Sequence, residues 1–311
     1  MEALLGNRVL FGEETLNRLH IFAGPWLDAA MAVVTVAGDE PFYLVALPVI
    51  YWCWDRRIAI YAGAAFLVTM TLNDWIKYAV NHPRPDPEKL LPGIRELALR
   101  HAPQSPGFPS GHTQGSLAFW TSVAILCRRP LFWVLWAVMI VLVPYSRLYL
   151  GVHYPGDVVG GLVIGALSLA LIIPALALGG AHYRKFNEWV LIAVIITVPL
   201  LVCLSLAGEH IYATTGTLSG FLAGALMGET RIRFNPRARL PWQPVKAVIG
   251  IAVVAALRLG LKALLPETLL AGFMRYWLIG FWCSFGAPWL FSQFGPLRGE
   301  AERNAPGGSG T

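Results

Sequence analysis

Charged residues are scarce in this sequence. Asp, Glu, Lys and Arg make up only 14% of its 311 residues, whereas 56% are hydrophobic and the mean hydropathy is +0.57. A soluble globular domain is charged at about a quarter of its positions. The composition therefore excludes an ordinary soluble protein and indicates a chain surrounded by lipid. The 12 Trp and 10 Tyr agree with this, because amphipathic rings favour the membrane–water interface.

Cysteine is also rare, and its spacing argues against a metal site. The four cysteines lie in or beside apolar segments, and we expect them to be buried as small hydrophobic residues: Cys53, Cys127, Cys203 and Cys283. A net charge of +6 would suggest a nucleic-acid partner in a soluble protein. In a membrane chain the position of the charges between apolar segments matters more, so we predict a lipid bilayer as the environment and no nucleic-acid partner.

Apolar stretches recur along the whole chain. They cover approximately Phe42–Trp54, Ile58–Val80, Thr113–Cys127, Leu131–Tyr149, Val158–Leu178, Val190–Ala207, Thr214–Met227, Val245–Leu265 and Phe273–Phe291. Several are long enough to cross a bilayer, which needs about 20 helical residues. Pro25–Ala37 precedes them as an interfacial helix or as part of a crossing. The pattern predicts an all-α fold, a polytopic bundle of transmembrane helices.

Two local patterns add detail to this bundle. The long connection 81–109 contains Leu90, Leu91, Ile94 and Leu97 at helical spacing, which predicts a short amphipathic helix on the membrane surface and a candidate lid. Glycines recur every four residues at Gly216, Gly220, Gly224 and Gly228, a spacing that lets helices approach closely in lipid. Packing between helices of the same chain is the favoured explanation, and a homodimer interface is the alternative.

Three short clusters carry the polar chemistry, each where an apolar stretch begins or ends. They are Lys77 with Arg84-Pro85, then Pro109-Ser110-Gly111-His112, then Ser146-Arg147 with His153 and Asp157. Neighbouring transmembrane helices run antiparallel, so alternation alone brings all three clusters to one face of the membrane.

The converged side chains predict a phosphate site. The cations are Lys77, Arg84 and Arg147, and both residue types bind phosphate oxygens. Ser110 and Gly111 lead into a helix, whose N-terminal N–H groups attract anions. A single cation at a membrane boundary is equally well explained as an interfacial anchor. That explanation does not account for three cations and two histidines at one place.

Two histidines and one carboxylate point to catalysis. His153 and Asp157 are four residues apart at a helix start and share a face. Asp157 can accept the Nδ1 proton and leave Nε2 of His153 free to attack. His112 would then protonate the departing alkoxide, while the cations stabilise charge on the phosphoryl oxygens. Only one carboxylate lies near, and the cations would repel a divalent ion, so we predict neither a metal nor another cofactor.

In order and spacing, these motifs resemble the signature of the type 2 phosphatidic acid phosphatase superfamily, over roughly Trp26 to Leu178. The resemblance implies a six-helix core, which the additional C-terminal transmembrane helices of this chain exceed. It implies a covalent phosphohistidine at His153 and leaving-group protonation by His112. The phosphate-binding residues that it implies are Lys77, Arg84, Ser110, Gly111 and Arg147.

The resulting functional prediction is a metal-independent membrane lipid phosphatase. Its substrate would be a lipid monophosphate or diphosphate, such as undecaprenyl diphosphate, phosphatidic acid or phosphatidylglycerol phosphate. A lipid phosphotransferase with the same intermediate is one alternative. The other is a non-catalytic protein that binds anionic lipid, against which His112, His153 and Asp157 argue.

The predicted domain organisation has three regions. Residues 1–180 form the catalytic membrane core with an N-terminal interfacial segment, 181–294 form C-terminal transmembrane helices of unknown role, and 295–311 form a disordered polar tail. Arg258, Lys262 and Arg275 lie in the C-terminal helices, towards the site face by alternation. They could attract an anionic head group, and interface anchoring explains them equally well.

Basic residues predict the orientation in the membrane. The connections opposite the site carry Arg56-Arg57, Arg128-Arg129, Arg184-Lys185 and the basic segment 231–239. Positively charged loops tend to be cytoplasmic. We therefore predict an integral protein of a bacterial inner membrane with its active site on the extracytoplasmic face. The loop 81–109 weakens the asymmetry, because it also carries Lys89, Arg95 and Arg100.

Overall fold

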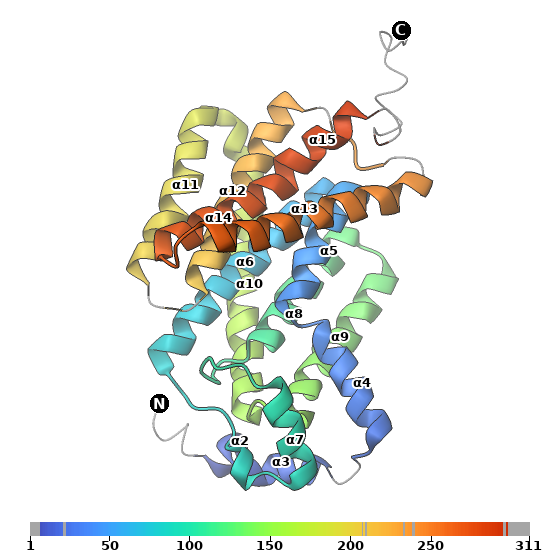
Figure 1. Ribbon diagram of the computed structural model, residues 1–311, viewed down its shortest axis with the longest axis vertical. Coiled ribbons are helices and arrows are strands. Elements are labelled where there is room, and N and C mark those ends of the chain that lie inside the picture. The colour runs from blue at the N-terminus through green and yellow to red at the C-terminus, as the bar shows by residue number, and fades with distance from the viewer. Residues whose placement is uncertain are drawn as a thin grey trace. The chain divides into compact units, whose positions relative to one another are not determined.

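The computed structural model describes residues 7–20, 23–206, 208, 210–232, 234–237, 240–294 and 297. All regular secondary structure in this described part is helical (Figure 1), which confirms the all-α prediction. The tail predicted to be disordered, 295–311, lies outside the described residues apart from Leu297.

Each predicted apolar stretch coincides with a helix. The long helices are α4 (Pro25–Val36), α5 (Glu40–Cys53), α6 (Arg56–Val80), α8 (Gly111–Cys127), α9 (Pro130–Tyr149), α10 (Pro155–His182), α11 (Glu188–Ser205), α12 (Ile211–Arg231), α13 (Gln243–Leu264) and α14 (Leu269–Phe281). The last stretch continues through a π-helical turn, Trp282–Gly286, into α15 (Ala287–Gln293). Short helices are α2 (Arg8–Phe11), α3 (Glu13–Leu19) and α7 (Pro92–His101), and 3₁₀ turns cover Pro87–Lys89, Tyr183–Lys185 and Leu240–Trp242.

By length and composition, five helices in the described part of the chain could each cross a membrane. They are α6, α9, α10, α11 and α13. The candidate span of α10 includes the 3₁₀ turn Tyr183–Lys185, and that of α13 includes the 3₁₀ turn Leu240–Trp242. The consecutive helices α4 and α5, bent by 52° at the break between them, pass the same test together and count as a sixth span if the pair forms one. The stretch Pro25–Ala37 is thus one arm of a bent pair, and Asp39 lies at the break between the arms.

The chain divides into two compact units that do not follow the sequence in order. The first comprises residues 1–43, 69–173 and 207–209, and the second comprises 44–68, 174–206 and 210–311. The three chemical clusters all belong to the first unit. The proposed domain boundary at residue 180 stays a prediction.

In the first unit, the long connection contains a short helix, α7, as predicted, but it begins at Pro92, after Leu90 and Leu91. Its place on the membrane surface and its role as a lid stay predictions. Figure 1 shows α7 beside the short helices α2 and α3. Its residues Ile94 and Ala98 are buried in a cluster with Leu16 of α3 and Met31 of α4. The apolar face of α7 therefore contacts protein rather than lipid, because the N-terminal helices provide apolar partners that the sequence pattern did not reveal.

In the second unit, the glycine face of α12 packs against α14. A Cβ atom on Gly216 or Gly220 would collide with the carbonyl oxygen of Phe273 or Trp277. A Cβ on Gly224 would collide with the Ser284 hydroxyl in the π-helical turn. The repeat therefore serves close packing within the chain, the explanation favoured from the sequence.

Candidate active site

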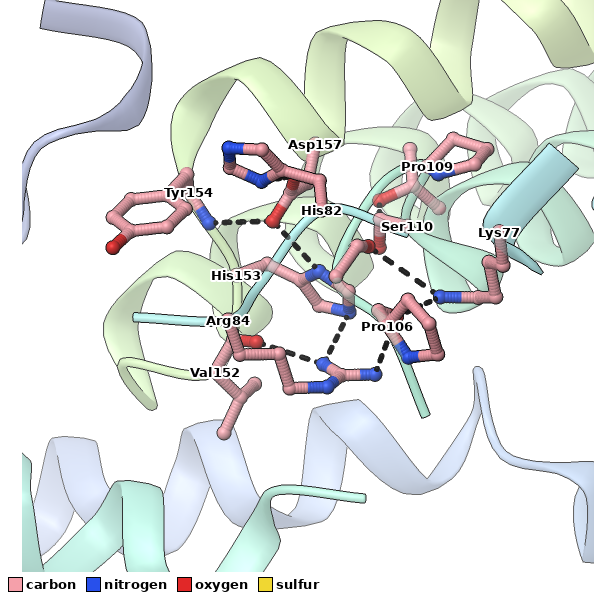
Figure 2. Close-up of polar contacts among 12 residues, drawn as sticks. Lys77, His82, Arg84, Pro106, Pro109, Ser110, Val152, His153, Tyr154 and Asp157 are labelled. Carbon is pink, nitrogen blue, oxygen red and sulfur yellow. Dashed lines mark hydrogen bonds and ion pairs between the residues drawn. The ribbon is translucent and has the colours of Figure 1, made fainter. Parts of the chain in front are cut away.

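The three sequence clusters meet in the first unit (Figure 2). Lys77 lies in the last turn of α6, and Arg147 lies in the last turn of α9. Ser110 is the N-cap of α8, which Gly111 and His112 begin, while Asp157 lies in the first turn of α10. The Ser110 backbone N–H donates to the carbonyl oxygen of Asp157 at 2.9 Å, which fixes the start of α8 against the start of α10.

His153 occupies the centre of the cluster, between a guanidinium and a carboxylate. Its Nε2 atom lies 3.0 Å from Arg84 Nη1, and its Nδ1 atom lies 3.2 Å from Asp157 Oδ2. Arginine can only donate, so Nε2 must accept and the ring proton must sit on Nδ1, where it is donated to Asp157. The surroundings thus select the tautomer that has its lone pair on Nε2, where it accepts from Arg84.

Asp157 is held in place by more than His153. Its Oδ2 atom also accepts from the Tyr154 backbone N–H at 2.9 Å. Its Oδ1 atom lies 4.0 Å from His82 Nδ1, and within the described residues neither of these two buried atoms has a hydrogen-bond partner. His82 is a neighbour of the site to which the sequence assigned no chemistry, because nothing in its spacing links it to Asp157.

Backbone carbonyl oxygens satisfy two of the predicted phosphate-binding cations. Arg84 donates from Nε to the Ser105 carbonyl at 2.8 Å and from Nη1 to the Val152 carbonyl at 2.8 Å. Lys77 Nζ donates to the Pro106 carbonyl at 2.7 Å. The segment 105–107 therefore supplies neutral oxygen acceptors to the cations that the sequence predicts to bind phosphate.

Arg147 is the least satisfied of the three cations. Its side chain is almost fully buried, at 2% exposed. One guanidinium nitrogen, Nη1, donates to Thr35 Oγ1 of α4 at 2.5 Å, while Nε is buried without a partner in the described part of the chain. A buried N–H without an acceptor is unfavourable, so Arg147 is suited to an anion that enters the site.

The partner of His112 is an aspartate that the sequence analysis left without a role. His112 Nε2 lies 2.6 Å from Oδ1 of Asp39, which is located at the break between α4 and α5. The approach requires Gly38, because a Cβ atom there would lie 2.9 Å from His112 Cδ2. The only sequence signal was a polar, glycine-containing interruption between two apolar stretches.

A polar scaffold behind the loop fixes the entry to α8. Asn73 on α6 donates from Nδ2 to the Pro109 carbonyl at 3.3 Å and to Gln114 Oε1 at 2.8 Å. Gln114 in turn donates to the Thr69 carbonyl at 3.1 Å. These bonds hold the residues before His112 to the helix that carries Lys77.

Electrostatics favour a neutral His153. Burial, followed by the positive charges of Arg84, Lys77 and Arg147, lowers the pKa of His153 well below its ordinary value. Burial also lowers the pKa of Arg84 to about 10, which leaves it charged at neutral pH. The site therefore combines an unprotonated imidazole with fixed positive charge, as an attack on a phosphate requires.

The described residues offer no group of three or more His, Cys, Asp or Glu that could hold a metal ion. Whether the reaction proceeds without metal stays a prediction. The residues gathered around His153 can bind an anion, orient an imidazole and transfer a proton.

Comparison with known proteins gives a consistent set of matches. The sequence profile of the PAP2 superfamily matches residues 58–178, and that of the PAP2 superfamily phosphatase transmembrane extension matches 212–301. YbjG of Escherichia coli (strain K12), provisionally named an undecaprenyl-diphosphatase, is 30% identical over 54% of this chain and 83% of its own.

Two relatives from Bacillus subtilis (strain 168) also match. Phosphatidylglycerophosphatase B is 27% identical over 55% of this chain and 86% of its own. The undecaprenyl-diphosphatase BcrC is 31% identical over 45% of this chain and 70% of its own. The PAP2 superfamily match, residues 58–178, includes all three clusters.

Proposed function

Because this chain belongs to the PAP2 superfamily and is an integral membrane lipid phosphate hydrolase, we propose that it works through a phosphohistidine at His153, without a metal. The observation that carries the proposal is the row of contacts from Arg84 through His153 to Asp157. It sets the imidazole tautomer, keeps the ring neutral and places a positive charge beside the attacking nitrogen.

The first step forms the enzyme–phosphate bond. Nε2 of His153 donates its lone pair to phosphorus, and the bond from phosphorus to the leaving oxygen breaks. The Nδ1 proton stays in its hydrogen bond to Asp157, which stabilises the positive charge that the ring acquires. His112 gives a proton to the leaving oxygen. Burial of His112 and the charge of Arg147 oppose its protonated form, and the carboxylate of Asp39 counteracts them and supports the protonation needed for that transfer.

Phosphate binding exchanges acceptors around the cations. Arg84 and Lys77 donate to carbonyl oxygens of the segment 105–107, and the phosphoryl oxygens replace those acceptors on binding. Arg147 contributes its unpartnered Nε, and Ser110 and Gly111 contribute the N-terminal end of α8. Charged acceptors bind these donors more strongly than neutral carbonyls do, so the exchange favours the bound phosphate.

The second step releases phosphate. A water molecule attacks phosphorus, His112 accepts a proton from that water, and the bond between phosphorus and Nε2 breaks. A lipid hydroxyl in place of water would give a phosphotransferase product from the same intermediate. The relatives are named as phosphatases, which favours water as the acceptor.

The names of the relatives suggest two substrate classes. One is an isoprenoid diphosphate, as in undecaprenyl diphosphate, and the other is phosphatidylglycerol phosphate. Phosphatidic acid is a third candidate from the family resemblance. The basic connections Arg56-Arg57, Arg128-Arg129 and Arg184-Lys185 support an extracytoplasmic site in a bacterial inner membrane.

The direct test is phosphate release by the purified protein in detergent with excess chelator. The panel is undecaprenyl diphosphate, phosphatidylglycerol phosphate and phosphatidic acid. Release that persists with chelator supports the metal-free mechanism, and the preferred lipid identifies the substrate class. Release that stops with chelator and returns with a divalent ion contradicts it, and phosphate found on a second lipid favours the transferase.

Replacing Asp39 with asparagine is expected to lower kcat by about tenfold, with little change in KM, because His112 then loses the charge that favours its protonated form. The deficit is expected to be larger for a lipid alkoxide than for p-nitrophenyl phosphate, whose leaving group needs no proton. Asp28→Asn, in the first turn of α4, is the control. Equal deficits for both substrates would show a merely structural role for Asp39.

Replacing Arg84 with glutamine is expected to move the acid limb of the kcat/KM profile to higher pH. Activity requires neutral His153 and is lost as the pH falls through its pKa. The charge of Arg84 lowers that pKa, so its removal raises it. The substrate titrates identically with both enzymes, so the difference between the profiles reports on the protein. The exposed control Arg95→Gln should leave the acid limb in place. An acid limb that also stays in place in Arg84→Gln contradicts the assignment.

A further inference from the structure

The second unit contains a separate cavity with excess positive charge. It has a volume of about 360 Å³ and is bordered by the end of α13 and the beginnings of α12 and α14. Ligand sites commonly measure roughly 300–1,000 Å³, so the space can hold a phosphate and part of a head group. Its charged lining residues are Arg258, Lys262, Arg275 and Glu267, three cations and one carboxylate.

Arg275 indicates what the cavity would bind. It lines the cavity, yet its side chain is only 8% exposed. Its Nε and Nη2 atoms are buried without a hydrogen-bond partner in the described part of the chain. A guanidinium buried without acceptors is unfavourable, and an anion in the cavity would supply them. Lys262, which is exposed on the same cavity wall, adds a second positive charge at its edge.

The helix start at the cavity adds to the positive potential. Thr268 caps α14 by accepting from the Ala271 N–H at 3.3 Å, and both Thr268 and Gly272 line the cavity. The first turn of a helix carries unpaired N–H groups and a partial positive charge. Opposite it, the ring of Tyr212 packs against Gly272, where a Cβ atom would lie 2.7 Å from Tyr212 Cδ2. This wall of the cavity is therefore closely packed.

We propose that this cavity is an anion site for a phosphate group, with Arg275 as its buried donor and Lys262 at its edge. The site is distinct from the catalytic residues, none of which line it. The phosphate can belong to an anionic lipid head group or be free in solution, since the recognition chemistry is the same. The transmembrane extension thereby gains a binding function of its own.

The test measures binding by calorimetry to the full chain in detergent, in the His153→Ala background so that nothing is hydrolysed. The probes are dihexanoyl phosphatidylglycerol and inorganic phosphate, and dihexanoyl phosphatidylcholine, whose zwitterionic head group has no net charge, is the control. We expect Arg275→Gln to raise the dissociation constant by about tenfold and Lys262→Gln to raise it by roughly threefold, since each removes a charged donor. Lys185→Gln removes an exposed lysine elsewhere in the same unit and should change nothing.

Weakened binding of phosphatidylglycerol alone identifies a lipid head group, and weakened binding of inorganic phosphate as well identifies a general phosphate site. Because binding at the catalytic cluster is common to all variants, the differences between them report on this cavity. If Arg275→Gln does not fold, Lys262→Gln decides. Binding of both probes that is unchanged by Lys262→Gln and Arg275→Gln, or no binding of either, overturns the proposal. Neither result depends on the phosphatase reaction.

Discussion

His153→Ala is expected to reduce phosphate release by at least about a thousandfold, because the variant has no nucleophile to form the intermediate. The rate that remains would come from binding and electrostatic stabilisation alone. The side chain is 1% exposed and bonded to Arg84 and Asp157, so the variant also leaves a small cavity. Phosphate release and thermal unfolding should therefore be measured on the same preparations.

His182→Ala is the matched control, since that histidine is exposed at the end of α10 and, within the described residues, bonds to the Leu178 carbonyl of its own helix. It should retain the wild-type rate. A folded His153→Ala protein with more than about a tenth of the wild-type rate would rule out His153 as the nucleophile.

Asp157→Asn is expected to lower kcat by about a hundredfold to ten-thousandfold. An asparagine can present its NH₂ group to Nδ1 of His153, which then accepts instead of donating. The ring proton moves to Nε2, and the attacking lone pair is lost. The Tyr154 N–H bonds to the same oxygen, Oδ2, so an NH₂ group turned towards Nδ1 also removes that bond. Thermal unfolding should therefore be measured beside kcat.

Asp55→Asn serves as the control for this substitution. Asp55 accepts from the Arg57 and Ile58 N–H groups at the start of α6, a capping role that asparagine also fills. It should leave kcat unchanged. An Asp157→Asn protein that retains wild-type kcat would show that the carboxylate does not set the tautomer.

The sequence predicted the helices and the meeting of the three polar clusters because both depend on local signals. Long apolar stretches end where the bilayer ends, so their lengths alone located the helices. Lys77 and Arg147 each fall in the last turn of a helix, and alternation of the spans brings them together. The pair His153 and Asp157 needed only the four-residue spacing of a helix face.

The parts that sequence reasoning missed depend on contacts between distant segments. Asp39 reaches His112 across a separation of 73 residues, and only the bend between α4 and α5 makes that contact. Thr35 meets Arg147 across 112 residues. Hydrophobic periodicity carries no signal for such pairs. The same holds for α2 and α3, which are too short to show a period but bury one face of α7.

The contacts of Arg84 also differ from the expected simple phosphate ligand. Its guanidinium bonds to His153 and to carbonyl oxygens of Ser105 and Val152. It therefore holds the proposed nucleophile in addition to carrying the charge proposed for phosphate binding. A motif identifies the residue type that chemistry requires, whereas the loop that folds over it determines what the side chain contacts before substrate arrives.

The measurement that tests the central claim most directly is trapping of the covalent intermediate. The purified protein would be mixed with lipid substrate labelled with ³²P in the terminal phosphate, in excess chelator, and quenched with base within a turnover. The account predicts a base-stable, acid-labile label on the peptide that contains His153, and no label in His153→Ala. Label on another residue, or turnover without any labelled protein at a quench time that captures the burst, would contradict it.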